Sequence, residues 1–156
     1  MSPVKPIPDG YQRVSPYLCV DGAANAIEFY KQVFDANERM RMADPAGRIG
    51  HAELQIGDSV VMLSDPYPEM NVVDPKKLGG SPVTLSVYVT DVDATFKTAL
   101  DNGATQTERP ENKFYGDRSG QFTDPWGQKW SVATHVEDVP PDEMQRRAAA
   151  AMSGGG

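Results

Sequence analysis

The four-residue turn pattern Asp-Pro-x-Gly occurs twice in this chain, as Asp44-Pro45-Ala46-Gly47 and as Asp124-Pro125-Trp126-Gly127. Aspartate at the first position, proline at the second and glycine at the fourth predict a type I turn that is closed by a left-handed glycine. Such a turn joins two antiparallel strands and determines which of their residues lie opposite each other. It therefore constrains the fold more than any other feature of the sequence.

Around the second turn, this register predicts that Phe122 pairs with Trp130, Gln121 with Ser131, and Ser119 with Ala133. Side chains alternate between the two faces of a strand, so one face is apolar and carries Phe122, Trp130 and Val132. The opposite face is polar and carries Ser119, Gln121, Lys129, Ser131, Ala133 and His135.

Around the first turn, the same rule predicts that Arg41 pairs with His51 and Arg39 with Glu53, with Met40 and Met42 on the apolar face. The strand over residues 49–56 then presents His51, Glu53 and Gln55 on its polar face. A tight turn at Gly57-Asp58 leads into a strand over residues 59–64. Four pairs are expected there: Ile56 with Ser59, Leu54 with Val61, Glu53 with Met62, and Ala52 with Leu63.

Each hairpin is preceded by a strand and a helix. The first strand is expected over residues 14–20, followed by a helix with Asp21 as N-cap and an apolar stripe of Ala23, Ala26, Ile27, Tyr30 and Phe34. The second strand is expected over residues 83–89, followed by a helix that begins after Asp91 and ends at Asn102-Gly103. Residues 104–107 are expected as a short strand and residues 108–117 as a loop.

The two series form an internal repeat, because Ser15 and Thr84 lie 69 positions apart, as do Met62 and Ser131. The sequence thus predicts an α+β fold of two paired βαβββ modules that form a curved mixed sheet with a cup-shaped cavity. The expected modules span residues 14–64 and 82–138, joined by a linker over 65–81. An extended lead-in over 1–13 precedes them, and a C-terminal helix with a mobile tail over 139–156 follows.

The helices should cover the apolar faces and leave the polar faces to line the cup. The expected lining is Ser15, Tyr17, His51, Glu53, Met62, Thr84, Ser86, Tyr88, Gln121, Ser131 and His135. A hollow that mixes aromatic rings with a few polar groups suits a small organic ligand. The alternative is a face that is merely solvated, as in many antiparallel sheets.

Charge and cysteine content indicate which partners and which cellular compartment the sequence favours. A formal charge of -7 disfavours nucleic acid and anionic membrane surfaces, and slightly favours a cationic ligand. The single cysteine, Cys19, excludes an internal disulfide and fits a reducing cytoplasm. The N-terminal stretch contains no apolar run typical of a signal peptide, which also favours a cytoplasmic protein.

Three motifs carry a family resemblance: the helix AIEFYKQVF and the stretches HAELQIGDSVVMLSD and YGDRSGQFTDPWGQKWSVATHVEDV. With the duplicated unit, the chain resembles the vicinal oxygen chelate superfamily, which has the glyoxalase and bleomycin-resistance fold, over about residues 12 to 138. The second and third motifs are similar to the PhnB-like subgroup in particular. The resemblance implies homodimers, a site enclosed by both modules, and, in the family's enzymes, a divalent metal held by His and Glu.

The positions that match the family's metal ligands are Ser15, Met62, Thr84 and Ser131. A thioether and three hydroxyls are not the imidazole and carboxylate ligands that a catalytic divalent ion needs. We therefore expect no metal and no other cofactor. The leading hypothesis is a metal-free, homodimeric protein that binds or sequesters a small aromatic or amphipathic molecule.

The rival hypothesis is a metal-dependent lyase or isomerase that uses a displaced site around His51, Glu53 and His135. Against it, Glu53 is expected to pair with Arg39 and Arg41 across the strands. A third interpretation is a structural dimer without a ligand.

Two further segments are expected to take part in binding or assembly. Tyr115 and Arg118 are expected near the opening of the cup, where they would contact ligand, although Arg118 could instead pair with Asp117. Trp126 is expected at an exposed turn position, where it could pack against a partner subunit.

Overall fold

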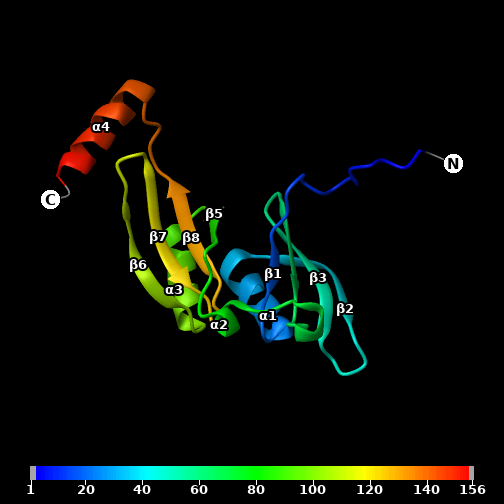
Figure 1. Ribbon diagram of the computed structural model, residues 1–156. Coiled ribbons are helices and arrows are strands. Elements are labelled where there is room, and N and C mark those ends of the chain that lie inside the picture. The colour runs from blue at the N-terminus through cyan, green and yellow to red at the C-terminus, as the bar shows by residue number, and fades with distance from the viewer. Residues whose placement is uncertain (1–2, 155–156) are drawn as a thin grey trace. The chain divides into compact units, whose positions relative to one another are not determined.

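The computed structural model describes residues 3–154 and divides into two compact units (Figure 1). Unit 1 comprises Met1–Ser81 together with Trp126–Gln128, and unit 2 comprises Pro82–Pro125 together with Lys129–Gly156. The first two residues of the predicted lead-in and the last two of the predicted mobile tail lie outside the described residues.

Unit 1 contains the first βαβββ series. Its elements are β1 (Tyr17–Cys19), α1 (Ala23–Phe34), β2 (Asn37–Ala43), β3 (Ile49–Ile56) and β4 (Ser59–Ser64). The sheet order is β1-β4-β3-β2, in which β1 runs parallel to β4 and the other pairs are antiparallel. The predicted linker over residues 65–81 contains two short helices, η1 (Pro68–Met70) and α2 (Pro75–Leu78).

Unit 2 repeats this topology. Its elements are β5 (Thr84–Tyr88), α3 (Val92–Asp101), β6 (Thr105–Asn112), β7 (Asp117–Thr123), β8 (Lys129–His135) and α4 (Pro141–Ser153), with the sheet order β5-β8-β7-β6. The parallel strand pairs have equivalent registers in the two units. Tyr17 lies opposite Met62 in unit 1, and Ser86, 69 positions after Tyr17, lies opposite Ser131 in unit 2. The predicted α+β class with two mixed-sheet βαβββ modules is confirmed.

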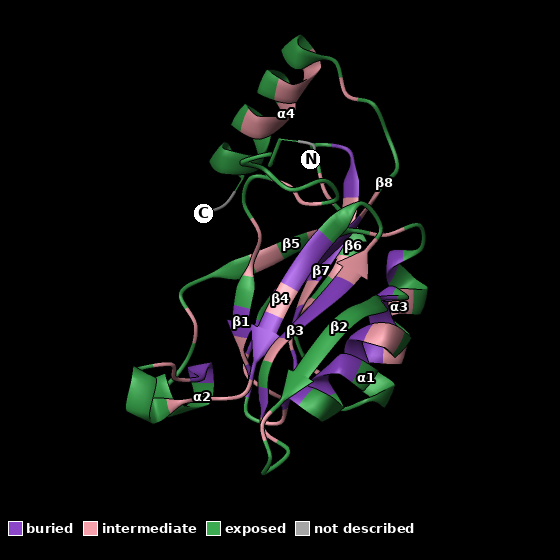
Figure 2. Ribbon diagram, turned by 90° about the vertical axis from the view of Figure 1, so that its right-hand side faces the viewer, coloured by how far each residue is buried: buried purple, intermediate pink, exposed green. Residues whose placement is uncertain are grey.

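The core of unit 1 lies between α1 and one face of its sheet. Ala26, Ile27 and Tyr30 of α1 are buried, as are Leu54 and Leu63 of the strands. Figure 2 shows buried residues along α1, β3 and β4, whereas β2 is exposed along its whole length. The hairpin pairs predicted between β3 and β4 are confirmed.

Trp126 packs against α1 and is half-buried. Its ring lies edge-on to Phe29, with the centroids 5.5 Å apart, and 6.3 Å from the Tyr30 ring. The expectation of an exposed turn position is therefore wrong. The isolated turn pattern places residue 126 at a turn, but only the packing of α1 provides a surface that covers the indole.

The start of α1 differs from the prediction. The N-cap is Gly22, not Asp21, and its φ of 114° lies in the left-handed region that favours glycine. A Cβ at this position would also lie 3.1 Å from the Trp126 Nε1. The first amides are capped from elsewhere, because Gly22 N and Ala23 N donate to Asp65 Oδ1 at 3.0 and 2.8 Å.

The core of unit 2 confirms the register predicted from the Asp124 turn. Phe122 lies opposite Trp130, Gln121 opposite Ser131 and Ser119 opposite Ala133. Phe122 packs edge-on against Phe96 of α3, with centroids 5.4 Å apart. The helix α3 has the predicted N-cap, because the Asp91 side chain accepts from Ala94 N.

The predicted register between β2 and β3 is wrong by one residue. Met40 lies opposite Glu53 and Met42 opposite His51, whereas Arg41 lies opposite Ala52. The register shifts twice. Gly50 of β3 is an extra residue between the pairs Ala43–Ile49 and Met42–His51, and Arg39 of β2 is an extra residue between Met40–Glu53 and Glu38–Leu54, where the predicted register returns. Between these two bulges the pairing is displaced by one residue, which places Met40 and Met42 opposite Glu53 and His51 and removes them from the predicted core.

Two strand boundaries also differ from the prediction. The first strand covers only Tyr17–Cys19, and Val14 is exposed instead of buried. The predicted loop over residues 108–117 is largely strand, because β6 continues to Asn112 in spite of Pro110. β6 is an edge strand with two register shifts, and proline is tolerated at such positions.

Among residues 3–154, no helix has the length and apolar character needed to cross a membrane.

Candidate functional site

The face of the unit 1 sheet opposite the buried one carries a row of residues that are register partners across all four strands. In order from β2 to β1, these are Met40, Glu53, Met62 and Tyr17. His51 and Met42 form the next pair along β3 and β2. We call these six residues the open face. Its apolar side chains remain accessible, because Tyr17 and Met42 are each 53% exposed and Met40 is 36% exposed.

A continuous chain of hydrogen bonds joins the polar residues of the open face. The Tyr17 hydroxyl lies 2.6 Å from His51 Nδ1, and His51 Nε2 lies 2.8 Å from Glu53 Oε2. The hydroxyl of Tyr11, from the segment before β1, donates to Glu53 Oε1 at 2.6 Å. The Tyr17 and His51 rings also contact each other, with centroids 5.3 Å apart. Glu53 is thus held from both sides.

The electrostatics of this chain are governed by the burial of Glu53, which is only 4% exposed. Burial alone would raise the pKa of its carboxyl, but the hydrogen bonds from His51 and Tyr11 outweigh burial and lower that pKa. The bond to Glu53 raises the pKa of Tyr11. Burial raises the pKa of Tyr17, and the charge of Glu53 adds to this effect. Both phenols are therefore neutral and Glu53 is ionised at neutral pH.

Three consecutive residues before β1 cross the sheet and attach to three consecutive strands. The Gln12 amide donates to Val60 O of β4 at 2.7 Å and accepts from Val60 N at 3.1 Å. Tyr11 contacts Glu53 of β3, and Gly10 O accepts from Arg39 Nη1 of β2 at 2.9 Å. The Arg39 guanidinium also lies over the Tyr11 ring, 4.5 Å from its centroid. This segment bounds one end of the open face.

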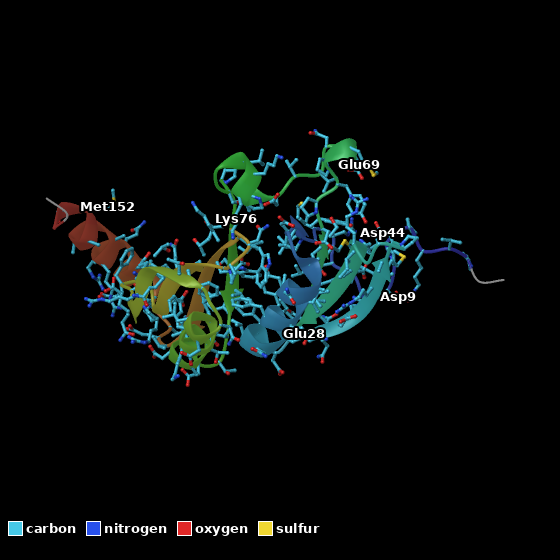
Figure 3. The ribbon with its side chains drawn as sticks, turned by 90° about the horizontal axis from the view of Figure 1, so that it is seen from below. Asp9, Glu28, Asp44, Glu69, Lys76 and Met152 are labelled. Atoms are coloured by element: carbon cyan, nitrogen blue, oxygen red, sulfur yellow. The ribbon has the colours of Figure 1, made fainter. Side chains whose placement is uncertain are left out.

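The turn between β2 and β3 is held by charge. Asp44 and Glu69, both labelled in Figure 3, pair with Arg48 at 3.1 Å each. The Arg48 guanidinium lies 3.7 Å from the centroid of the Tyr67 ring. These contacts explain the position of the turn and involve no residue of the open face.

The residues at the family's metal positions do not fit a divalent ion. Met62 lies on the open face, and Ser15 precedes β1. In unit 2, Thr84 lies opposite Lys129, and Ser131 opposite Ser86. One thioether and three hydroxyls are poor ligands for such an ion. Within residues 3–154, no three or more His, Cys, Asp or Glu side chains are grouped to hold a metal ion.

Unit 2 carries a separate cluster at the end of its sheet. Tyr88 donates its hydroxyl proton to Asp117 Oδ2 at 2.7 Å, and His135 Nδ1 lies 2.8 Å from Asp117 Oδ1. His135 Nε2 lies 2.8 Å from Asp138 Oδ1. The hydrogen bond to Asp117, and then that to Asp138, raises the pKa of His135. The imidazole is therefore held between two carboxylates.

The remaining predicted site residues lie in unit 2 but outside this cluster. Thr84 and Ser86 lie on β5 and are exposed, and Gln121 and Ser131 form a half-buried pair. Arg118 forms a two-pronged ion pair with Asp93 at 2.9 and 3.0 Å, not with Asp117. Tyr115 lies in the turn between β6 and β7, where its ring contacts Phe114.

The thiol of Cys19 is chemically inert by its surroundings. Burial raises its pKa to about 11, and the nearby carboxylates of Asp74, Asp65 and Asp21 add to this shift. A thiol with this pKa is protonated at neutral pH and is a poor nucleophile.

Sequence reasoning missed Tyr11, Asp117, Met40 and Met42. No periodicity marks Tyr11, because it lies in an irregular proline-rich segment. Asp117 could have been predicted from the sequence, since extending the β7–β8 register by two residues places it opposite His135. The two methionines were assigned to the wrong face because the bulge at Gly50, next to the turn, leaves no mark in the residue pattern.

Comparison with known proteins gives a consistent result. A model of the Glyoxalase/Bleomycin resistance protein/Dioxygenase superfamily matches residues 11–132. An uncharacterized protein of Mycobacterium bovis is 46% identical over 146 residues, which cover 92% of this chain and 93% of that protein.

Solved structures share the fold. The PhnB protein from Bacillus cereus has a TM-score of 0.63 and 18% identity, covering 79% of this chain and 99% of that chain. The fosfomycin resistance protein FosX from Listeria monocytogenes, solved with Mn(II) and sulfate, has a TM-score of 0.62 and 16% identity. The match to FosX covers 88% of this chain and 97% of that chain.

Proposed function

The chain belongs to the Glyoxalase/Bleomycin resistance protein/Dioxygenase superfamily, as its motifs predicted, and from this premise we propose that it binds a small amphipathic organic molecule on the open face without a metal ion. The family's metal positions hold Ser15, Met62, Thr84 and Ser131, which do not suit a divalent cation.

The observation that carries this proposal is the combination of accessible apolar side chains with a fixed polar chain. Tyr17, Met40 and Met42 expose apolar surface on a sheet face, where a merely solvated face would carry short polar side chains. Methionine adapts its shape to a ligand, and an aromatic ring offers a flat contact surface. Glu53 and His51 supply polar groups of defined position between them.

The proposal includes a homodimer, because the resemblance to the family implies paired subunits. Light scattering after gel filtration would test it, and a monomer at micromolar concentration would contradict it. The proposed location is the cytoplasm, which the single cysteine supports, since disulfides are rare there.

Methyl NMR of ¹³C-methionine-labelled protein would test the binding proposal directly. A ligand on the open face should shift the signals of Met40, Met42 and Met62, whereas those of Met70 and Met152, which lie outside this face, should not move. A diverse set of small aromatic compounds serves as probe. If no compound shifts the three open-face methyl signals at millimolar concentration, the proposal is wrong.

A second candidate function is acid–base catalysis, which the hydrogen-bonded series Tyr17–His51–Glu53 favours. It retains the rival idea of a lyase or isomerase centred on His51, Glu53 and His135, with a divalent ion such as the Mn(II) in the FosX structure. A metal-dependent turnover of a carbonyl substrate that is lost in His51→Ala and Glu53→Gln would support it. Equal turnover in both variants would exclude it.

A further inference from the structure

The direction of the hydrogen bonds on the open face restricts the ligand. Because the pKa of Glu53 is lowered, its carboxylate can only accept. Tyr11 therefore donates to Oε1 and His51 Nε2 donates to Oε2. The protons of both groups are directed at the buried carboxylate and away from the solvent.

This arrangement determines the tautomer of His51. The Tyr17 hydroxyl keeps its proton, because burial raises its pKa, and this proton needs an acceptor. Nδ1 therefore accepts from the Tyr17 hydroxyl at 2.6 Å, since the other acceptor of that hydroxyl, Gly50 O, is 3.5 Å away. The Tyr17 oxygen thus acts as an acceptor toward its surroundings.

The other side chains on or beside this face do not change the excess of hydrogen-bond acceptors over donors. The sulfur atoms of Met40, Met42 and Met62 are weak acceptors and not donors. The Gln55 amide donates to Gly57 O at 3.0 Å. Arg39 is a donor, but it lies at the Tyr11 end, where Gly10 O binds its Nη1.

We infer that the open face recognises ligands whose polar end is a hydrogen-bond donor, such as a phenol or an amine, through the outward oxygen atoms of Tyr17 and Tyr11. This inference rests on the proposed binding at the same face and specifies its ligand class. A ligand that offers only acceptors would find no donor directed at it among the six residues of the open face, and the Arg39 guanidinium beside Tyr11 donates to Gly10 O and Gln55 Oε1. The ionised carboxylate of Glu53 beneath the two phenols adds to the preference.

A matched pair of neutral probes tests the inference: 2-naphthol carries a donor, and 2-methoxynaphthalene has the same ring system without one. In a titration followed by the methyl signals of Met40, Met42 and Met62, 2-naphthol should bind about threefold to tenfold more tightly, the range expected for one net hydrogen bond. Equal affinity, or tighter binding of the methoxy compound, would overturn the inference while the proposed binding stands. If neither probe shifts these signals, both proposals are wrong.

Two variants identify the responsible oxygen. Tyr17→Phe should abolish most of the preference for 2-naphthol and leave the affinity for 2-methoxynaphthalene unchanged within about twofold, because only a hydroxyl is removed. Tyr11→Phe should have the smaller effect, since this residue is less exposed. Tyr115→Phe, which removes a hydroxyl from unit 2, is the matched control and should keep the preference. If both Tyr17→Phe and Tyr11→Phe keep the preference for 2-naphthol, the inference is wrong. If a variant fails to fold, the comparison of the two probes on the unmodified protein tests the inference.

Discussion

Glu53 is the residue on which the open face depends, because a buried carboxylate needs hydrogen-bond donors to remain ionised. Tyr11→Phe removes one of its two donors at 2.6 Å. We expect this variant to lower the free energy of unfolding by about 1–3 kcal/mol, the cost of leaving a buried acceptor unsatisfied. Urea denaturation at pH 7 measures the change.

The same variant should alter the response to acid. A carboxyl whose folded pKa is lowered stabilises the protein above its unfolded pKa, about 4.3, and this stability is lost as the pH falls through the folded value. Tyr11→Phe should therefore lose less stability than the unmodified protein between pH 6 and pH 3. The control is Tyr115→Phe, which alters an exposed ring and should change stability by less than about 0.5 kcal/mol. Equal behaviour of the two variants would contradict the role of Tyr11.

His135 makes the folding stability of unit 2 depend on pH with the opposite sign. The carboxylates of Asp117 and Asp138 raise the pKa of this histidine, so the charged imidazole stabilises the folded state below the unfolded pKa of about 6.5. That contribution is lost as the pH rises through the higher folded value. Between pH 6 and pH 9, the urea midpoint of the unmodified protein should fall relative to that of His135→Gln. Parallel curves for the two proteins would show that the histidine is not coupled to folding.

At the scale of the element, the start of α1 depends on a carboxylate that is distant in sequence. Asp65 accepts from Gly22 N and Ala23 N, and its second oxygen accepts from Ile49 N at 2.7 Å. Asp65→Ala removes all three bonds, so we expect a loss of about 2–3 kcal/mol in the free energy of unfolding, measured by urea denaturation.

Asp21→Ala provides the matched control for Asp65→Ala. Asp21 is the residue that the sequence indicated as N-cap, but it is exposed and lies outside the cap. Its replacement should change stability by less than about 0.5 kcal/mol. A larger loss for Asp21→Ala than for Asp65→Ala would restore the original interpretation of the helix start.

The hairpins show where sequence reasoning succeeds for elements. Both β3–β4 and β7–β8 have the predicted pairs, because short turns of defined type leave a single register. The β2–β3 hairpin has the predicted Asp44 turn, with Gly47 N donating to Asp44 O at 2.9 Å, yet its register is shifted. The difference arises from two bulges, at Gly50 of β3 and at Arg39 of β2, because no buried face of the exposed edge strand β2 enforces the alternation.

At the scale of the whole molecule, the absence of imidazole and carboxylate ligands at the family's metal positions has a direct consequence. We expect that prolonged treatment with EDTA leaves the unfolding temperature unchanged within about 1 °C, because no binding energy is then linked to folding. Elemental analysis of the protein before treatment supplies the control. One equivalent of Ni, Zn, Fe or Mn per chain, with a lower unfolding temperature after its removal, would contradict the metal-free proposal.

The repeated βαβββ topology, the two hairpin registers closed by short turns, and the family can be predicted from the amino-acid pattern alone. Each of these follows from local turn chemistry, from alternation, or from spacing along the chain. Of the open face, the pattern predicted Tyr17, His51, Glu53 and Met62, because these residues alternate on regular strands.

The groups that bind Glu53, and the methionines that lie beside it, depend instead on packing between distant parts of the chain. Tyr11 reaches the carboxylate from 42 positions away along the chain, and Asp65 reaches the start of α1 from a similar separation. Met40 and Met42 lie opposite Glu53 and His51 because Gly50 of β3 is an extra residue next to the turn. Contacts between distant segments depend on how the chain closes on itself, and a bulge depends on the fit between strands, so neither is encoded in a local pattern.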